Sequence, residues 1–355
     1  MHSVSAPADY YNGGVGTRVF EKARGGLFGF GLDRNIKDAY EWLVENYETD
    51  DQIFIFGFSR GAFTARSLAG FITKCGILRP GAPLGVAELF QRYRTAPDTR
   101  TIRNLTGKPA AELSLQESWL LKFAHVADVT MVGVWDTVGS LGIPFGKLSG
   151  ISRSSFGFLS TGLYQSQKHA YQAIALDEHR PDFTPTLWTK HVYSDGRPTA
   201  APRLLADVEQ RWFVGAHANV GGGYATDPLP QTPLRWLMGK ASQLGLEFRE
   251  QVEPDPTSLP HPVADSYGGF LGGTYRFLPG RTSPYNRPIG VAPVGDGAAV
   301  SEVINETIDG SVFGKWRADV AYRPRNLTAW AQTHGLQPET LNGPISATDA
   351  SPVPP

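Results

Sequence analysis

Residues 57–61 read Gly-Phe-Ser-Arg-Gly and place Ser59 between two glycines. The apolar run 53–56 comes directly before them, and residues 62–68 have the composition of a helix. A strand, a G-x-S-x-G turn and a helix in this order predict a nucleophile elbow, which lifts a serine hydroxyl clear of a sheet. We expect a side chain at either glycine to collide with the neighbouring strand and helix. The context favours a reactive serine over a glycine-rich turn that happens to contain one.

A serine becomes a good nucleophile only beside a base, and the base needs an orienting partner. His217 follows the strand-like run 209–214 and enters the triple glycine 221–223, and it is the only one of the eight histidines in such a position. Asp136 directly follows the apolar run 129–135. Ligands collect at the carboxyl ends of parallel strands, where both side chains are expected to lie. We therefore predict His217 as general base and Asp136 as its acid.

Other assignments stay open at this point. Asp207 precedes the strand of His217 and is the reserve acid, while Asp177 is a third candidate, less favoured because a helix is expected to end there. Asp136 could instead cap a turn, and His217 could be a structural histidine. The backbone N–H of Arg60 is the expected oxyanion donor, because it follows the nucleophile. No earlier strand is evident that would supply a second donor.

Composition excludes several classes of function. Lys plus Arg total 33 and Asp plus Glu 34, so no overall charge draws the chain to nucleic acid. No C-x-x-C, H-E-x-x-H or acidic metal loop occurs, and the glycine-rich run 25–31 lacks the pattern of a phosphate-binding loop, so no metal or cofactor is expected. Cys75 is the single cysteine, which excludes an intrachain disulfide. No signal peptide or membrane span is visible, which predicts a protein that is cytoplasmic as synthesised.

The fold class predicted from these patterns is α/β, with a parallel sheet, crossover helices and long loop insertions. No strand is expected before the one that leads into Ser59. One domain is expected over residues 1–336, with insertions near 76–127 and 140–165 that could form a lid or an acyl-chain pocket, and a flexible Pro/Ser-rich tail over 337–355. The expected strands are 52–57, 129–135 and 209–214. The expected helices are 32–47, 60–74, 86–93, 111–125, a segment containing Ala170, Ala173, Ile174 and Leu176, and 233–244.

Several stretches resemble the α/β-hydrolase family of type VI secretion phospholipase effectors and their uncharacterised bacterial and fungal relatives. These stretches are GGVGT (13–17), GLDRNIKDAY (31–40), IFGFSRGAFTAR (55–66), VWDTVG (134–139), ALDE (175–178), WFVGAH (212–217) and YRPRNL (322–327). The resemblance implies a Ser-Asp-His lipase-type hydrolase, with Ser59 as nucleophile, His217 as base and Asp136 as acid. It differs at Asn219, where relatives often carry Asp, and at the start, where relatives open with a strand ending in Asp-Gly.

The function expected from this reading is hydrolysis of carboxylic esters through an acyl-enzyme, with a lipid or phospholipid as substrate and peripheral membrane contact. A small-ester carboxylesterase or thioesterase is the alternative among enzymes. A non-catalytic α/β-hydrolase-like binding protein is the alternative outside them. Export by a secretion system, with a secretion or immunity partner, is a further expectation that follows only from the resemblance.

Overall fold

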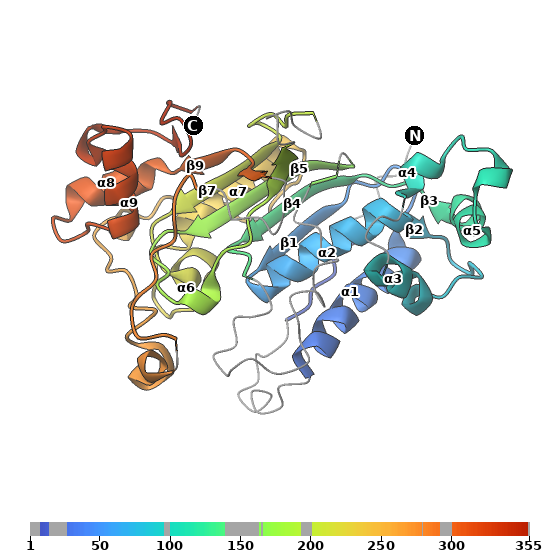
Figure 1. Cartoon of the computed structure of the whole chain (residues 1–355), viewed down its shortest axis with the longest axis horizontal. Helices are drawn as coiled ribbons and strands as arrows, with labels where there is room; N and C mark the ends of the chain where they lie inside the picture. The colour runs from blue at the N-terminus through green and yellow to red at the C-terminus, as the bar shows by residue number, and fades with distance from the viewer. Residues whose placement is uncertain are drawn as a thin grey trace.

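A six-stranded sheet lies at the centre of the computed structural model, with strand order β1-β4-β5-β7-β9-β10 (Figure 1). The structure describes residues 8–13, 27–95, 100–138, 163–164, 166–192, 201–278, 280–291 and 300–353. The first five strands in this order are parallel, and β10 pairs antiparallel with β9. The strands are β1 (Phe54–Phe58), β4 (Val129–Trp135), β5 (Gln167–Ala175), β7 (Val208–Phe213), β9 (Glu306–Ile308) and β10 (Ile345–Ser346). Two small sheets pair β2 (Ile77–Leu78) with β3 (Ala124–His125) and β6 (Thr189–Val192) with β8 (Val300–Val303).

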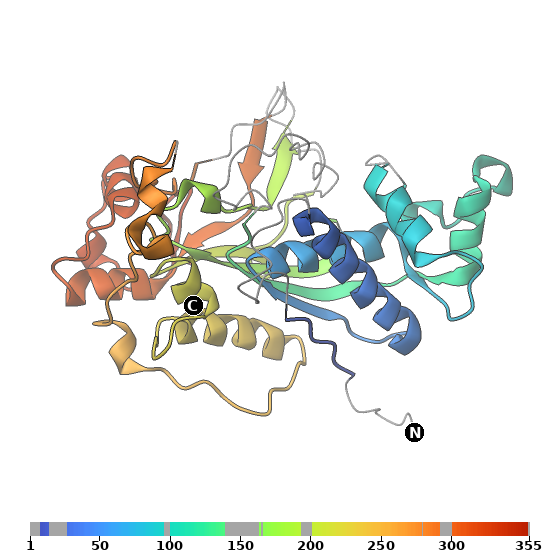
Figure 2. The ribbon, with the colours of Figure 1, turned by 90° about the horizontal axis from the view of Figure 1, so that it is seen from below.

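Helices cover both faces of this sheet. Helix α2 packs on β1 and β4, and α7 packs on β4 and β5 from the opposite face (Figure 2). The helices are α1 (Leu27–Asn46), α2 (Arg60–Cys75), α3 (Val86–Thr95), α4 (Ile102–Leu105), α5 (Leu115–Phe123), α6 (His217–Gly221), α7 (Gln231–Gln243), α8 (Gly310–Ala318) and α9 (Arg325–Thr333). Side chains alternate between the two faces along β4, so Val132 packs on the α2 side and Met131 on the α7 side. A parallel strand covered on both faces is apolar throughout, which explains its sequence.

Strand β5 corrects the sequence-based prediction of a helix around Ala170 and Ile174. The segment is a nine-residue strand that pairs in parallel with β4 on one side and β7 on the other. Its residues from Ala170 onward are all buried, because the strand lies in the middle of the sheet. A fully buried strand loses the alternation of apolar and polar residues, so its spacing fits a helix as well as a strand. Asp177 therefore follows a strand and does not end a helix.

The insertion at 76–127 lies at the amino end of the sheet, away from Ser59. The insertion begins at the carboxyl end of α2 and leads into the start of β4. Helix α2 begins directly after Ser59 and has 16 residues, so about 24 Å separate its two ends. Figure 1 shows α3, α4 and α5 at this end of the molecule. These helices are therefore badly placed to form a lid over the serine. The other insertion, 140–165, lies outside the described residues apart from 163 and 164.

The chain from 337 to 353 is packed against the rest of the protein, which corrects the prediction of a flexible tail there. Strand β10 adds to the sheet beside β9, Ala347 is buried, and its carbonyl accepts a hydrogen bond from Trp330 Nε1 at 2.8 Å. A proline-rich composition does not prevent such a segment from pairing at a sheet edge. Residues 354–355 lie outside the described part.

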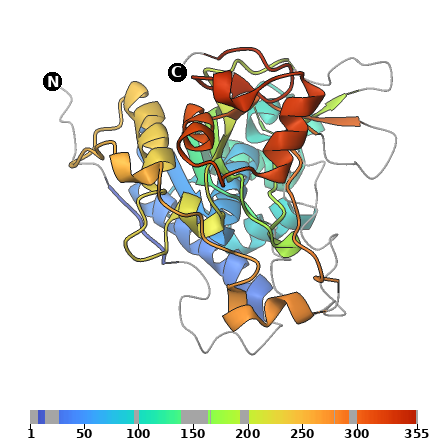
Figure 3. The ribbon, with the colours of Figure 1, turned by 90° about the vertical axis from the view of Figure 1, so that its left-hand side faces the viewer.

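The carboxyl ends of the parallel strands face the viewer in Figure 3, where the segment that follows α7 crosses in front of the sheet toward α8 and α9. Trp212 of β7, Ile308 of β9 and Trp330 of α9 belong to one core cluster at this end of the sheet. This core holds the crossing segment next to the carboxyl ends of β5 and β7. Among the described residues, no helix is both long enough and apolar enough to cross a membrane.

Candidate active site

Ser59 occupies a strained turn between β1 and α2. Its φ of 59° and ψ of −121° lie in a region that residues other than glycine rarely adopt. Its N–H donates to the Trp135 carbonyl at 3.0 Å, which fixes the turn to the end of β4. A Cβ at Gly57 would come within 2.3 Å of the Gly61 carbonyl oxygen, so only glycine fits there. A Cβ at Gly61 would meet nothing within 4 Å, so the predicted collision is wrong for the second glycine.

Ser59, His217 and Asp136 form one hydrogen-bonded row, although 158 positions separate the serine from the histidine. His217 Nε2 lies 2.8 Å from Ser59 Oγ, and His217 Nδ1 lies 2.5 Å from Asp136 Oδ2. Asp136 is fully buried, His217 is 6 % exposed, and Ser59 is partly exposed. The acid is thus shielded from water while the serine is partly exposed, and this arrangement can deprotonate a serine.

The parallel strands bring the three side chains together at the carboxyl ends of the strands. Ser59 follows β1, Asp136 follows β4, and His217 comes shortly after β7. Asp136 itself has a φ of 41°, and its N–H donates to the Ala173 carbonyl at 2.7 Å. This turn points its carboxylate back across the end of β5, where the Ala175 N–H donates to Oδ1 at 3.0 Å.

Arg287 is a member of this site that sequence reasoning missed. It is fully buried, and its guanidinium binds both carboxylate oxygens of Asp136, at 2.6 Å from Oδ1 and 3.0 Å from Oδ2. Burial by itself would raise the pKa of Asp136, but the charge of Arg287 and the hydrogen bond with His217 outweigh it and hold that pKa well below its usual range. Arg287 lies in an irregular segment and carries no local motif, so no sequence signal pointed to it.

Two aromatic rings enclose the imidazole of His217. The Phe58 ring lies 4.6 Å from it between centroids, and the Phe183 ring meets it edge-on at 5.0 Å. Helix α6 can approach Phe58 this closely because residue 221 is glycine, whose Cβ would come within 2.1 Å of the Phe58 ring. The triple glycine that pointed to His217 thus serves, at its first member, to bring histidine and aromatic ring together.

Two carboxylates after β5 support the backbone around His217 without touching its ring. Asp177 accepts from the Gly215 N–H at 2.7 Å and from the Tyr322 hydroxyl at 2.9 Å. Glu178 accepts from the His217 N–H at 3.2 Å and forms a buried ion pair with Arg180. Burial raises the pKa of Asp177. Both groups therefore position the loop, and the structure does not bring Asp177 to the imidazole.

The remaining predicted residues lie as follows. Asp207 directly precedes β7, and its carboxylate lies 3.4 Å from His169 Nδ1. It is therefore at the amino ends of the strands, whereas His217 is at their carboxyl ends. Arg60 is the first residue of α2, and the N–H groups of a helix's first turn point out of its amino end. Asn219 accepts from the Ala216 N–H at 3.0 Å and donates to Asp227 at 2.7 Å, so it holds the turn that leads into α6.

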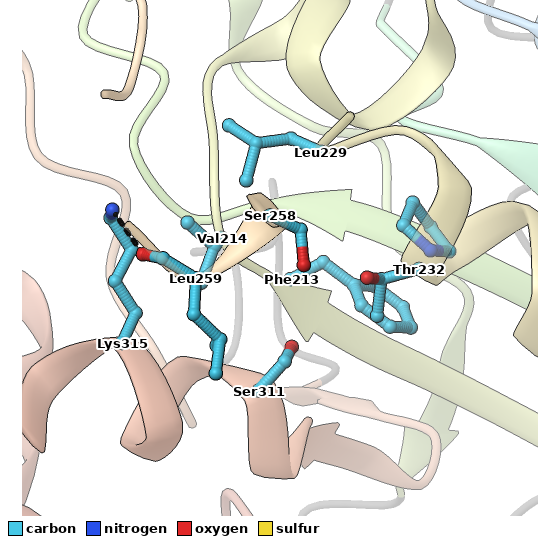
Figure 4. A pocket seen from close by; sticks show the side chains of 9 residues that line it. Phe213, Val214, Leu229, Thr232, Ser258, Leu259, Ser311 and Lys315 are labelled. Atoms are coloured by element: carbon cyan, nitrogen blue, oxygen red, sulfur yellow. Dashed lines mark hydrogen bonds between the residues drawn. The ribbon is translucent and has the colours of Figure 1, made fainter. Parts of the chain in front are cut away.

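A small cavity lies behind the loop that leads from β7 to His217 (Figure 4). Its lining comes from the end of β7, the start of α7 and the residues just before it, the turn at 256–259, and α8: Phe213, Val214, Leu229, Thr232, Pro233, Ser258, Leu259, Ser311 and Lys315. Lys315 Nζ donates to the carbonyls of Leu259 at 2.9 Å and His261 at 2.7 Å. None of Ser59, Asp136 and His217 lines this cavity, so it is separate from the hydrogen-bonded row.

Comparison with known proteins places most of the chain in one family. The family model described as "T6SS, Phospholipase effector Tle1-like, catalytic domain" matches residues 3–240. An uncharacterised protein of Saccharomyces cerevisiae is 31 % identical over 169 residues, which are 47 % of this chain and 23 % of the yeast protein. The chain thus spans about a quarter of the length of that relative.

Two solved structures are also similar. One is the Tle1 effector bound to the VgrG spike from the type 6 secretion system, with 20 % identity, a TM-score of 0.28, and coverage of 57 % of this chain and 32 % of that one. The other is an uncharacterised protein from Pseudomonas aeruginosa, with 19 % identity, a TM-score of 0.30, and coverage of 64 % and 30 %.

Proposed function

Since the chain belongs to the family of type VI secretion Tle1-like phospholipase effector catalytic domains, we propose that it is a serine hydrolase that cleaves carboxylic esters of lipids. The observation that carries the proposal is the row from Ser59 Oγ through His217 to Asp136, with separations of 2.8 and 2.5 Å. Nucleophile, base and orienting acid stand in the order and at the distances that acyl transfer requires.

In the proposed reaction, Ser59 Oγ attacks the ester carbonyl while His217 Nε2 takes the hydroxyl proton. Asp136 accepts from Nδ1–H and stabilises the imidazolium that forms. The negative oxygen of the tetrahedral intermediate is stabilised by the Arg60 N–H at the positive end of α2. His217 then gives its proton to the leaving alcohol, and the acyl group stays on Ser59. Water then attacks the acyl-enzyme while His217 takes one of its protons. The bond between Ser59 Oγ and the acyl carbon breaks, His217 returns the proton to Oγ, and the carboxylic acid is released.

The direct test is labelling of the full chain with a fluorophosphonate probe, beside Ser59→Ala and His217→Ala. Labelling should be lost in both variants, and Asp136→Asn should lower ester turnover on the order of 10³- to 10⁴-fold. His334→Ala is the matched histidine control, because its ring contacts Trp330 at the end of α9, and it should label as the wild type does. Equal labelling of Ser59→Ala and wild type would exclude Ser59 as the nucleophile.

The lipid part of the proposal needs a separate measurement. Turnover of p-nitrophenyl esters from acetate to palmitate, and of phospholipid vesicles, should rise with chain length and increase sharply once the substrate aggregates. A preference for soluble short-chain esters would make the protein a small-ester carboxylesterase. Absence of labelling in folded wild-type protein would favour a binding protein with a hydrolase fold. Contact with a membrane surface, and any secretion or immunity partner, belong to this proposal as well.

A further inference from the structure

Arg287 joins three segments around the candidate acid. Besides its two bonds to Asp136, Nη1 donates to the Ala175 carbonyl at 2.7 Å and Nη2 donates to the carbonyl of Phe183. Ala175 ends β5, and the ring of Phe183 packs against His217. One side chain therefore fixes the carboxylate, the end of the neighbouring strand and an aromatic wall of the base. It lies beyond residue 240, where the family match ends.

We propose that Arg287 is a positioning residue of the hydrolase site, which acts through Asp136 to set both the orientation of the acid and the charge that His217 experiences. This inference rests on the proposed function. Only a guanidinium suits the place, because it offers parallel N–H donors to a carboxylate and still has hydrogens for two carbonyls. A lysine ammonium is a point charge with three donors and cannot make all four contacts.

The charge argument follows from burial. Asp136 and Arg287 are both fully buried, so their mutual attraction is screened far less than it would be at the surface. Part of the carboxylate's negative charge is therefore balanced by the arginine rather than by the imidazolium that forms during attack. Without Arg287, the carboxylate would favour the protonated imidazole already in the free enzyme. The acid limb of the kcat/KM profile, which reports that protonation, would then move to higher pH.

Other charged groups near His217 leave this argument intact. Among the described residues, the charged groups around the pair are Arg287, Asp177 and Glu178 after β5, and Arg180, whose guanidinium lies over the Phe183 ring. Asp177 binds the Gly215 N–H and the Tyr322 hydroxyl and does not contact the imidazole. Glu178 and Arg180 are paired with each other at 2.8 Å, so their charges largely cancel at the imidazole. Of the charged groups that the described residues bring to this pair, Arg287 is the one that contacts the Asp136 carboxylate directly.

The experiment compares Arg287→Met and Arg287→Lys with wild type, measuring ester kcat/KM from acid to alkaline pH. We expect Arg287→Met to lose at least tenfold in kcat/KM and to move the acid limb upward by about one pH unit. Arg287→Lys keeps the charge, so its limb should stay near the wild-type pH while kcat/KM falls roughly tenfold from lost orientation. Arg211→Met is the matched control, because Arg211 is also buried and is paired with Glu209 and Asp309 away from the serine.

Arg211→Met should be less stable than wild type, but the acid limb of its kcat/KM profile should lie at the wild-type pH. An unmoved limb in folded Arg287→Met, or the same shift in Arg211→Met, would overturn the proposal. If Arg287→Met does not fold, Arg287→Lys decides, since wild-type kcat/KM in that variant would also overturn it. The test is run only on wild-type protein that labels at Ser59, so absence of labelling there contradicts the proposed function and not this inference.

Discussion

The Phe58 ring lies against the imidazole of His217, with 4.6 Å between centroids, and so joins β1, which leads into Ser59, to α6, which begins at His217. Their contact depends on Gly221, since a Cβ there would come within 2.1 Å of the Phe58 ring. Such an overlap forces the ring to move, and the ring's movement disturbs the imidazole. The distance between His217 Nε2 and Ser59 Oγ is therefore sensitive to one methyl group that touches neither residue.

Gly221→Ala should lower ester kcat/KM roughly 100-fold, because a displacement of about 1 Å in a catalytic group has an effect of that order. The measurement is steady-state kinetics together with the rate of fluorophosphonate labelling. Gly239→Ala is the control: this glycine lies inside α7, where a Cβ would meet nothing within 4 Å. The control should keep wild-type kinetics and gain about 0.5–1 kcal/mol in unfolding free energy. Wild-type kinetics in Gly221→Ala would contradict the role given to the Phe58 contact.

The two glycines of the elbow should respond differently to alanine. At Gly57 the new Cβ would lie 2.3 Å from the Gly61 carbonyl oxygen and 2.7 Å from the Ala62 nitrogen, both backbone atoms. Gly57→Ala should therefore cost about 1–3 kcal/mol of stability and abolish labelling. Gly61→Ala should fold and label like wild type. Denaturant unfolding and probe labelling of the pair check this, and equal behaviour of the two variants would show that the elbow relaxes.

Asn219→Asp should harm the protein. Asn219 Nδ2 donates to Asp227 Oδ2 at 2.7 Å, and the substitution would set two carboxylates against each other at that distance. We expect a loss of about 1–3 kcal/mol in unfolding free energy and a lower kcat/KM, because the turn before His217 is disturbed. Adding Asp227→Asn should restore both, since one donor and one acceptor again face each other. Faster turnover in the single variant would mean that an acid at 219 supports the base directly.

Acid should remove one identifiable contribution to stability. The hydrogen bond from Arg100 lowers the pKa of Glu117 from 4.5 to about 2. A folded-state pKa below the unfolded one means that the ionised group stabilises the fold above about pH 4.5 and that this stabilisation is lost as the pH falls toward 2. The difference in unfolding free energy between wild type and Glu117→Gln should therefore be constant near pH 6 and shrink below about pH 4.5.

Urea unfolding at a series of pH values measures that difference. Glu112→Gln is the control, because the Glu112 side chain is 53 % exposed and its ion pair with Lys108 is a loose 3.5 Å. It should show no trend with pH. A difference for Glu117→Gln that does not change with pH would contradict the lowered pKa of Glu117.

The sequence was most informative where a local pattern and the buried structure coincide. The run 129–135 is apolar apart from Thr130, because both faces of β4 are covered, and its predicted bounds are those observed. Strand β5 is also buried, but the spacing of its apolar residues fits a helix as well as a strand. For this reason the prediction of a helix there was wrong. Ser59, Asp136 and His217 could be found because each directly follows or closely follows a strand.

Arg287 could not be found in this way. Its role depends on a partner 151 positions earlier in the chain, and its own neighbourhood is an irregular segment rich in glycine and proline. The tail from 337 had the composition of disorder, and only the free edge of β9 explains why it is ordered. Contacts of long sequence separation, rather than local propensity, decided these cases.

The distances along the chain within the site also have a consequence for folding. The elbow is a local structure that can form as soon as β1 and α2 meet, whereas His217 contacts Ser59 across 158 positions and Arg287 contacts Asp136 across 151. Contacts between residues so far apart in the sequence form late in folding, because the entropy cost of closing a long loop must be overcome first. During refolding, helical signal should therefore return before Ser59 becomes reactive toward a phosphonate. The rate at which the serine becomes reactive would time the last docking step of the chain, and not the formation of its helices.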